Sequence, residues 1–260
     1  MAGLPDGLQS FDLTGQLAVV TGASRGIGLA MATALARAGA DIVGVSATMP
    51  ADGGLAGSAV TSAGRAFTPI AVDFARRDEV ARLAHELTHG ERAVDILVNN
   101  AGTIARAPAV SHSDADWDRV LQVNLSSQFM LTREVGAQMV ERGRGKVIFT
   151  ASMLSFQGGI NVVGYTAAKS AIAGVTKALA NEWASHGVNV NAIAPGYIAT
   201  DNTAALRADA DRNAAILGRI PAARWGSPED LAGATVFLAS RASDYVHGTV
   251  LAVDGGWLGR

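Results

Sequence analysis

The sequence predicts an α/β fold, a single doubly wound domain in which helices cover both faces of a seven-stranded parallel sheet. Short, nearly all-apolar runs alternate with longer helical patterns, as expected when strands are buried on both faces. No linker-like change of composition divides the 260 residues, and apolar residues make up 49% of them, enough for a large core. We therefore expect one domain over residues 15–260, preceded by an N-terminal arm over residues 1–14.

Seven runs have the length and composition of buried strands: 16–21, 41–46, 66–73, 95–100, 145–152, 188–195 and 249–253. Helices are expected from the end of the first strand to about residue 38, and over 78–89, 114–140, 163–186 and 228–239, whereas 51–64 is either a weak helix or a loop. Ser227 followed by Pro228 is typical of a helix start. The polar, Ala-rich stretch near 200–218 predicts a substrate lid over 197–218, because closure over a substrate would exclude water.

Composition excludes several classes of function. The net charge of −2 gives no strongly basic surface, so nucleic acid is not an expected partner. No run of 18 apolar residues predicts a membrane span, and the N-terminus does not have the pattern of a signal peptide. The absence of cysteine excludes disulfides and zinc–thiolate sites and is consistent with a reducing cytoplasm.

The first strand runs directly into TGASRGIG at 21–28, which opens a helix. Glycines at such a turn let backbone N–H groups approach a pyrophosphate, whose negative charge is favoured at a helix N-terminus. The spacing is G-x-x-x-G-x-G rather than the more familiar G-x-G-x-x-G, and the alternative is a tight turn with no ligand. The dinucleotide-binding candidates are Gly22, Ser24, Arg25, Gly26, Ile27 and Gly28.

A second turn, NNAG at 99–102, ends the fourth strand at the same edge of the sheet. The Asn99 amide is predicted to hold the neighbouring strand and loop, while Ala101 and Gly102 leave room for a flat ring or a ribose. An ordinary Asn/Gly turn is the alternative. Two such turns at one edge favour a cofactor site.

Tyr165 and Lys169 lie four residues apart, on one face of the predicted helix. A phenol has a pKa of roughly 10, and a neighbouring ammonium favours the phenolate and lowers that pKa. The pair therefore predicts an acid/base for carbonyl–alcohol interconversion beside a nicotinamide. Ser152 closes the fifth strand and could bond the substrate oxygen, and Asn124 could hold a water that relays a proton from Lys169. Without the glycine turn beside it, the pair would be interpreted as an ordinary surface contact.

One motif suggests a different class of protein. His85-Glu86-Leu87-Thr88-His89 matches the H-E-x-x-H pattern of zinc proteases. Val80, Leu83, Ala84 and Leu87 form the apolar stripe of this helix, which places both histidines on its solvent side. We expect neither a third ligand nor a cleft near them and therefore predict no metal site.

The motifs together resemble the short-chain dehydrogenase/reductase family, whose single domain has the Rossmann fold. The resemblance covers essentially the whole chain and rests on TGASRGIG, DILVNNAG, Asn124, Ser152, Y-x-x-x-K at Tyr165 and Lys169, PGYIAT at 195–200 and the closing VDGGW. It implies that Asn124, Ser152, Tyr165 and Lys169 form a catalytic tetrad. It also implies cofactor contacts from Asp73, near the adenine, and from Tyr165, Lys169, Pro195, Gly196, Ile198 and Thr200, with Ile198 and Thr200 at the nicotinamide carboxamide.

The second half more narrowly resembles the 2-deoxy-D-gluconate 3-dehydrogenase and 2-dehydro-3-deoxy-D-gluconate 5-dehydrogenase subfamily, which implies a deoxy sugar acid as substrate. Where that subfamily usually has two adjacent arginines just past NNAG, the segment 103–107 retains only Arg106. A bidentate arginine suits a carboxylate, so Arg106 is the first candidate, with Arg207 and Arg212 as weaker ones. Gln157 and Asn161 are candidate partners of substrate hydroxyls, beside Ser152 and Tyr165.

The sequence leaves the choice between NAD and NADP open. An acid at the end of the second strand would favour NAD, but VSATM at 45–49 has none. Arg25 could pair with the 2′-phosphate of NADP, whereas the subfamily resemblance favours NAD.

Other functions remain as alternatives: reduction of a different substrate such as gluconate or a 3-oxoacyl thioester, or a protein on the same fold that binds NAD(P) without turnover. The family resemblance also implies a homotetramer, in which the helices near 114–140 and 163–186 pair across one axis and the C-terminus meets another subunit.

Overall fold

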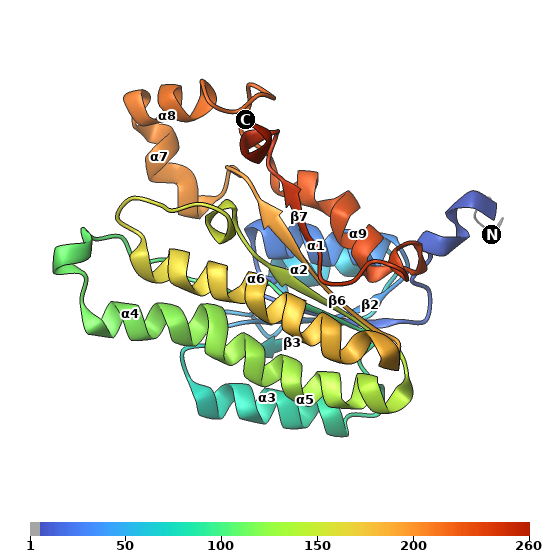
Figure 1. The fold of residues 1–260 in the computed structure, drawn as a ribbon. Helices are drawn as coiled ribbons and strands as arrows, with labels where there is room; N and C mark the ends of the chain where they lie inside the picture. Colours follow the sequence, from blue (N-terminus) through green and yellow to red (C-terminus); the bar gives the residue numbers. More distant parts are fainter. Residues whose placement is uncertain (1–5) are drawn as a thin grey trace.

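Seven parallel strands form one sheet at the centre of the computed structural model, which describes residues 6–260 (Figure 1). The strand order is β3-β2-β1-β4-β5-β6-β7, and every neighbouring pair is parallel. The strands are β1 (Leu17–Thr21), β2 (Asp41–Ser46), β3 (Phe67–Ala71), β4 (Ile96–Asn99), β5 (Gly145–Thr150), β6 (Val188–Pro195) and β7 (Val250–Val253). The predicted fold class is confirmed.

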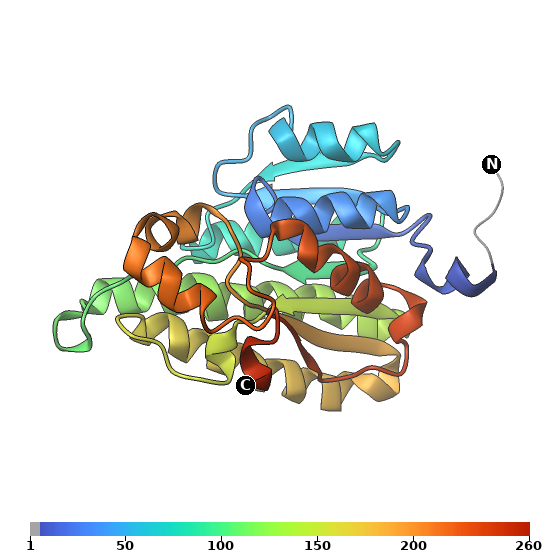
Figure 2. The same ribbon diagram turned by 90° about the horizontal axis from the view of Figure 1, so that it is seen from above.

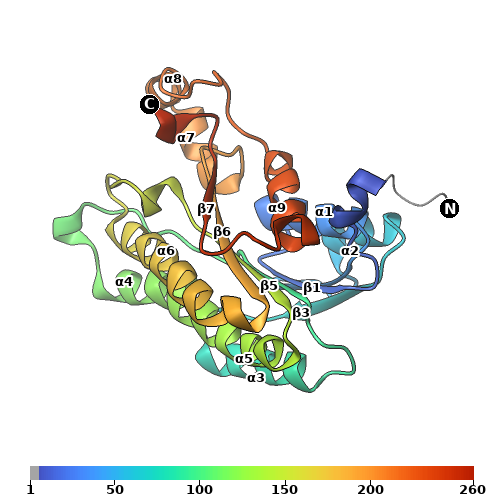
Figure 3. The same ribbon diagram turned by 45° about the vertical axis from the view of Figure 1, so that its right-hand side comes forward.

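Helices cover both faces of this sheet, as Figures 2 and 3 show from two directions. One face carries α1 (Gly26–Arg37), α2 (Gly54–Ser62) and α9 (Ala232–Ala239). The other carries α3 (Arg77–His89), α4 (Asp114–Leu121), α5 (Ser127–Arg142) and α6 (Val163–Trp183). Successive residues of a strand point into the two opposite cores. In β4, Leu97 packs in the core under α3, α5 and α6, whereas Ile96 and Val98 pack in the core under α1 and α9. This explains why the strands are apolar throughout rather than alternating.

The chain winds outward in both directions from the gap between β1 and β4, which are neighbours in the sheet but not in sequence. In a doubly wound sheet, such a reversal of strand order leaves a crevice beyond the C-terminal ends of the two strands. The glycine turn follows β1 and the NNAG turn follows β4, so both candidate cofactor loops leave the sheet at this point.

The predicted helix over 114–140 is not continuous. A π turn at Gln122–Ser126 separates α4 from α5. The ambiguous stretch 51–64 contains α2, and the helix predicted at 228–239 begins as a 3-10 turn, Pro228–Leu231, before α9. Ser227 caps that turn together with Asp230, as its position before a proline suggested.

The predicted lid contains a 3-10 turn, Asp201–Thr203, and two short helices, α7 (Ala204–Ala208) and α8 (Ala210–Leu217). Most residues of this segment are exposed, and Leu206 and Ile216 pack it into an apolar cluster with Met153 and Trp257. Closure of this segment over a substrate stays a prediction.

Of the predicted arm, residues 1–5 lie outside the described part of the chain. Asp6–Phe11 forms a 3-10 helix, and Leu13 is fully buried in the core beside α1. Within residues 6–260, no helix is long and apolar enough to cross a membrane.

Candidate active site

The glycine turn presents the N-terminus of α1 to the crevice. Gly22 and Gly26 have φ values of +69° and +54°, a region in which side chains are strained. The N–H groups of Gly22 and Ala23 donate to Val45 O, which ties the turn to the end of β2. Arg25 occupies the N-cap position without a side-chain cap, so no side chain covers the first N–H groups of the helix. This arrangement fits the pyrophosphate of a dinucleotide.

Gly28 shows how closely the turn is packed. A Cβ at this position would lie 2.0 Å from Gly22 O and 2.6 Å from Asn100 Nδ2. The Asn100 amide donates to Thr21 O at 3.0 Å and to Gly22 O at 3.4 Å. A side chain at residue 28 would therefore force apart the two loops that border the crevice.

Gly28→Ala should weaken cofactor binding by at least about tenfold and destabilise the fold by about 1–3 kcal/mol, because the clash is with backbone. Gly233→Ala is the matched control, since an added Cβ on this exposed α9 residue meets nothing within 4 Å. Cofactor titration and urea unfolding of both variants test the expectation. Equal behaviour of the two variants would contradict it.

The NNAG turn corrects one expectation. Asn99 is fully buried and donates to Thr132 Oγ1 at 2.8 Å, so its amide bonds to α5. Asn100 instead holds the neighbouring strand and loop: besides its amide bonds, its N–H donates to Thr21 Oγ1, which also accepts from Ala101 N, both at 2.9 Å. Asn99 is the last residue of β4, and Asn100 follows the strand, where the glycine turn leaves the neighbouring β1.

Asn124 lies at the π turn and is fully buried. Its Oδ1 accepts from Thr103 N at 3.1 Å, and its Nδ2 donates to Thr103 O and to Val120 O, both at 2.8 Å. The amide therefore fixes the backbone just past NNAG, and a Cβ at Gly102 would lie 2.8 Å from Asn124 Oδ1. A π turn is a frequent feature of functional sites.

Ser152, Tyr165 and Lys169 come together beyond the end of β5. Ser152 caps the 3-10 turn Met153–Ser155, and its side chain is hydrogen-bonded to Tyr165. Lys169 is only 2% exposed; its Nζ lies 5.6 Å from the Tyr165 ring centroid and donates to Thr150 O at 2.5 Å. The π turn that carries Asn124 packs against α6, which bears Tyr165 and Lys169. The structure thus brings Ser152, Tyr165 and Lys169 together and packs the turn that bears Asn124 against their helix.

Burial dominates the protonation of this pair in the cofactor-free protein. Desolvation raises the pKa of Tyr165 above its usual value, against the opposing effects of the Ser152 hydrogen bond and the positive charge of Arg106. Burial also lowers the pKa of Lys169 to about 8. The prediction that the ammonium lowers the pKa of the phenol is therefore wrong for this state of the site, in which Lys169 bonds to a carbonyl.

Two predicted arginines meet the start of the lid. Arg25 Nη1 lies 3.2 Å from Asp201 Oδ2, and Arg106 Nη2 donates to Asn202 O at 3.1 Å. Thr200 lies beside Gly26, and Ile198 is buried, so the residues after β6 border the glycine turn. Pro195 ends β6, and the N–H of Gly196 donates to Val253 O.

The other predicted contacts lie around this edge. Asp73 follows β3, and its Oδ1 accepts from Ala75 N at 2.9 Å. Asn161 has a φ of +62°, and its carbonyl accepts from Ala107 N, which joins the Arg106 loop to the loop before Tyr165. Ser24 and Ile27 lie in the glycine turn, as expected.

The structure adds Arg219, which the sequence did not single out, and places Trp257, the last residue of the VDGGW motif, as a buried intrachain contact. Both contact Gln157 Oε1, with donor–acceptor distances of 3.4 Å from Arg219 Nη2 and 3.2 Å from Trp257 Nε1. They lie far from Gln157 in sequence, so no local pattern predicts these contacts. Of the weaker arginine candidates, Arg207 donates to Thr200 O and Arg212 is exposed on α8.

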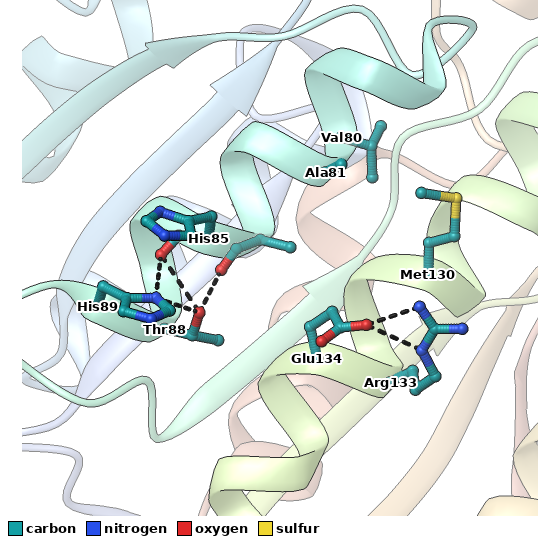
Figure 4. Close-up of a pocket in the computed structure, with 9 residues that line it drawn as sticks. Val80, Ala81, His85, Thr88, His89, Met130, Arg133 and Glu134 are labelled. Atoms are coloured by element: carbon teal, nitrogen blue, oxygen red, sulfur yellow. Dashed lines mark hydrogen bonds and ion pairs between the residues drawn. The ribbon is translucent and has the colours of Figure 1, made fainter.

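The H-E-x-x-H segment lies on α3, and Figure 4 shows its histidines with the α5 residues Met130, Arg133 and Glu134. His85 and His89 are exposed, as expected, but they also line a groove between α3 and α5, so the expectation of no cleft is wrong. The two rings stack at 4.0 Å, and Glu134 in the groove is paired with Arg133 at 2.6 Å. Within residues 6–260, no group of three His, Asp or Glu side chains could hold a metal ion.

Comparison with known proteins agrees with this geometry. The family model described as enoyl-(acyl carrier protein) reductase, a short-chain dehydrogenase/reductase model, matches residues 22–258. The chain belongs to the short-chain dehydrogenase/reductase family. It is an NAD(P)-dependent oxidoreductase.

Similar proteins cover almost the whole chain. A 2-dehydro-3-deoxy-D-gluconate 5-dehydrogenase of Pseudoalteromonas atlantica is 57% identical over 97% of this chain and 100% of its own length. A proposed 2-deoxy-D-gluconate 3-dehydrogenase of Agrobacterium tumefaciens, solved with bound NADP, is 51% identical with a TM-score of 0.90 over 97% of this chain and 100% of that one. A proposed NAD(P)-dependent gluconate 5-dehydrogenase of Beutenbergia cavernae, also with NADP, is 52% identical with a TM-score of 0.93 over 96% and 100%.

Proposed function

We propose that this enzyme transfers a hydride between NAD(P) and a hydroxyl or keto carbon of a deoxy sugar acid of the 2-deoxygluconate or 2-keto-3-deoxygluconate type. The observation that carries the proposal is the Tyr165 phenol, hydrogen-bonded to Ser152 and subject to the positive charge of Arg106 at the crevice between β1 and β4. An acid/base and a cationic side chain at the edge of one crevice are suited to a substrate that carries both hydroxyl groups and a negative charge.

Four side chains of the enzyme have separate roles in this reaction. NAD(P), when bound, exchanges a hydride with the carbon that bears the reacting oxygen. Ser152 hydrogen-bonds that oxygen, and Tyr165 takes its proton in oxidation or supplies one in reduction. Lys169, buried beneath the phenol, and Asn124, which fixes the loop past NNAG, connect Tyr165 to solvent through a proton relay.

The substrate class follows from the relatives together with the arginine-rich rim. Arg106 and Arg207 donate only to backbone carbonyls among the described contacts, and carboxylates are strong partners for such guanidinium groups. Gluconate and a 3-oxoacyl thioester are the alternative substrates to compare.

The direct test is reduction of a 2,5-diketo-3-deoxy sugar acid, followed by the change in nicotinamide absorbance with NADH and NADPH in parallel. Turnover with kcat/KM above that for gluconate and for a 3-oxoacyl thioester is the expected result. Protein that binds the cofactor but acts better on a thioester would overturn the substrate assignment and leave the enzyme class intact.

The same assay measures cofactor preference, and we expect NADPH to be favoured. The end of β2 has no acid, Arg25 is exposed at the rim, and the Ser46 hydroxyl is buried without a hydrogen-bond partner in the described chain. Arg25→Gln should lower kcat/KM with NADPH roughly tenfold and with NADH less than about twofold. Arg37→Gln, at the exposed far end of α1, is the control; equal losses with both cofactors would contradict a role for Arg25 at the 2′-phosphate.

A homotetramer in the reducing cytoplasm completes the proposal. The outer face of α6 carries the small exposed residues Ser170, Gly174 and Ala178, and Phe129 on α5 is 39% exposed. Small side chains allow close approach of helices, so this layer is suited to contact a second copy. Light scattering would test it, because a monomer has a mass of 26.6 kDa.

A further inference from the structure

Arg219 is a cation held at the rim of the site without an acidic partner. Its guanidinium carbon lies 4.0 Å from the Trp257 ring centroid, and its Nη2 donates to Gln157 Oε1 at 3.4 Å. Within residues 6–260, no carboxylate lies within 4.0 Å of it, whereas Arg25 at the same rim is paired with Asp201.

The C-terminal segment fixes this guanidinium in place. Trp257 is only 4% exposed and packs with Met153, Ile216 and Ile220, while its Nε1 donates to Gln157 Oε1. Arg260 Nη1 donates to the carbonyls of Gly218 and Arg219 at 3.3 and 3.4 Å. An arginine stacked on an immobilised ring loses less freedom when it binds an anion.

The position of Gln157 links this cluster to the substrate. Gln157 lies on the loop between Ser152 and Tyr165, five residues past Ser152. Its Oε1 accepts from both Arg219 and Trp257, so the Nε2 group is the donor left for a substrate oxygen. A carboxylate accepts from a guanidinium and an amide N–H together.

Arg106 and Arg219 are suited to different ends of the substrate. The positive charge of Arg106 opposes the rise in the pKa of the Tyr165 phenol, which places this arginine toward the reacting oxygen. In a sugar acid that reacts away from C1, the carboxylate lies some carbon atoms from that oxygen. A second cation, beside Gln157 rather than beside the phenol, therefore suits the carboxylate.

We propose that Arg219 and the Gln157 amide bind the substrate carboxylate, and that Trp257 is a positioning residue for both. This inference rests on the proposed sugar-acid function. It identifies a specificity residue directly after the lid, so the bound carboxylate connects the end of the lid to the loop that carries Ser152.

The test compares gluconate with gluconamide, which lacks the charge, by calorimetric titration of NADPH-loaded enzyme. Wild type should bind gluconate at least about tenfold more tightly. Arg219→Gln should weaken gluconate binding about 10- to 100-fold and gluconamide binding less than about threefold. Arg82→Gln, an exposed arginine on α3, is the matched control and should leave both affinities unchanged.

Trp257→Phe separates positioning from packing, because it keeps a ring under Arg219 but removes the N–H donor to Gln157. It should reduce the preference for gluconate about two- to fivefold and raise KM for the sugar acid without changing kcat. Trp225→Phe is its control, since Trp225 Nε1 donates to Asn213 in the same apolar cluster.

Three results would overturn the carboxylate assignment: wild type binding neither probe or both equally, Arg219→Gln weakening both probes to the same extent, or Arg106→Gln alone abolishing the preference. Failure of the proposed function is distinct, since it would appear as wild type that prefers gluconate in the titration yet reduces no sugar acid with either cofactor.

Discussion

Tyr165→Phe is expected to lower kcat/KM about 10³-fold while changing cofactor affinity less than about threefold. The substitution removes only the phenol oxygen, so the ring still packs beside Lys169 and the fold is preserved. Ser152 remains to hold the substrate oxygen, but no group exchanges a proton with it. Steady-state kinetics and titration with NADPH measure the two quantities separately.

Tyr245→Phe is the matched control for this substitution, because Tyr245 is fully exposed. We expect wild-type kinetics from it. Tyr165→Phe enzyme that turns over within about tenfold of wild type would exclude the phenol as the acid/base and direct attention to Ser152.

Lys169→Met is expected to inactivate the enzyme and, at the same time, to stabilise the cofactor-free fold. The buried ammonium is costly, since burial lowers the pKa of Lys169 from 10.5 to about 8. Each pKa unit corresponds to about 1.4 kcal/mol, so the cost at neutral pH is about 3 kcal/mol. Losing the bond to Thr150 O offsets part of the gain, which leaves a net stabilisation of about 1–2 kcal/mol.

The pH dependence of that gain has a definite sign. Below pH 8, both the folded and the unfolded chain carry the Lys169 proton, and the cost of the buried charge is present in full. Between about 8 and 10.5, the folded protein releases this proton while the unfolded chain keeps it, so wild-type stability recovers as pH rises. The stability difference between Lys169→Met and wild type should therefore shrink over this range.

Urea unfolding at pH 7 and near pH 10 measures the difference. Lys177→Met provides the control, because Lys177 is exposed on the same helix and should show no such pH-dependent gap. A difference that stays constant or grows with pH would contradict the depressed pKa of Lys169.

Sequence patterns were sufficient to predict those features that depend on residues close together in the chain. The strands lie within two residues of their predicted bounds because a sheet covered on both faces requires continuous apolar runs. The glycine turn was readable because residue 28 tolerates no Cβ, and the Tyr165–Lys169 pair because helical spacing places residues four apart on one face.

Errors arose where a partner distant in sequence decides the outcome. The π turn contains Asn124, which bonds to Thr103 twenty-one residues earlier, and hydrophobic periodicity carries no signal for either feature. Asn99 and Asn100 are the same residue type. Only their tertiary contacts show that the Asn99 amide bonds to α5 and the Asn100 amide to the end of β1. The phenol pKa was predicted in the wrong direction because spacing shows the nearby ammonium but not the water that burial removes.

The amino-acid sequence alone determined the fold class and the edge of the sheet at which the candidate site lies, because these follow from periodicity and turn chemistry; its resemblance to the family supplied the four residues that we propose carry the chemistry. Only the tertiary structure placed Arg219 and Trp257 against Gln157, more than sixty residues away in sequence for the first and 100 for the second. It also showed that Arg25 and Arg106 meet the same turn of the lid. Such contacts depend on how the last third of the chain folds back over the sheet, which no local pattern encodes.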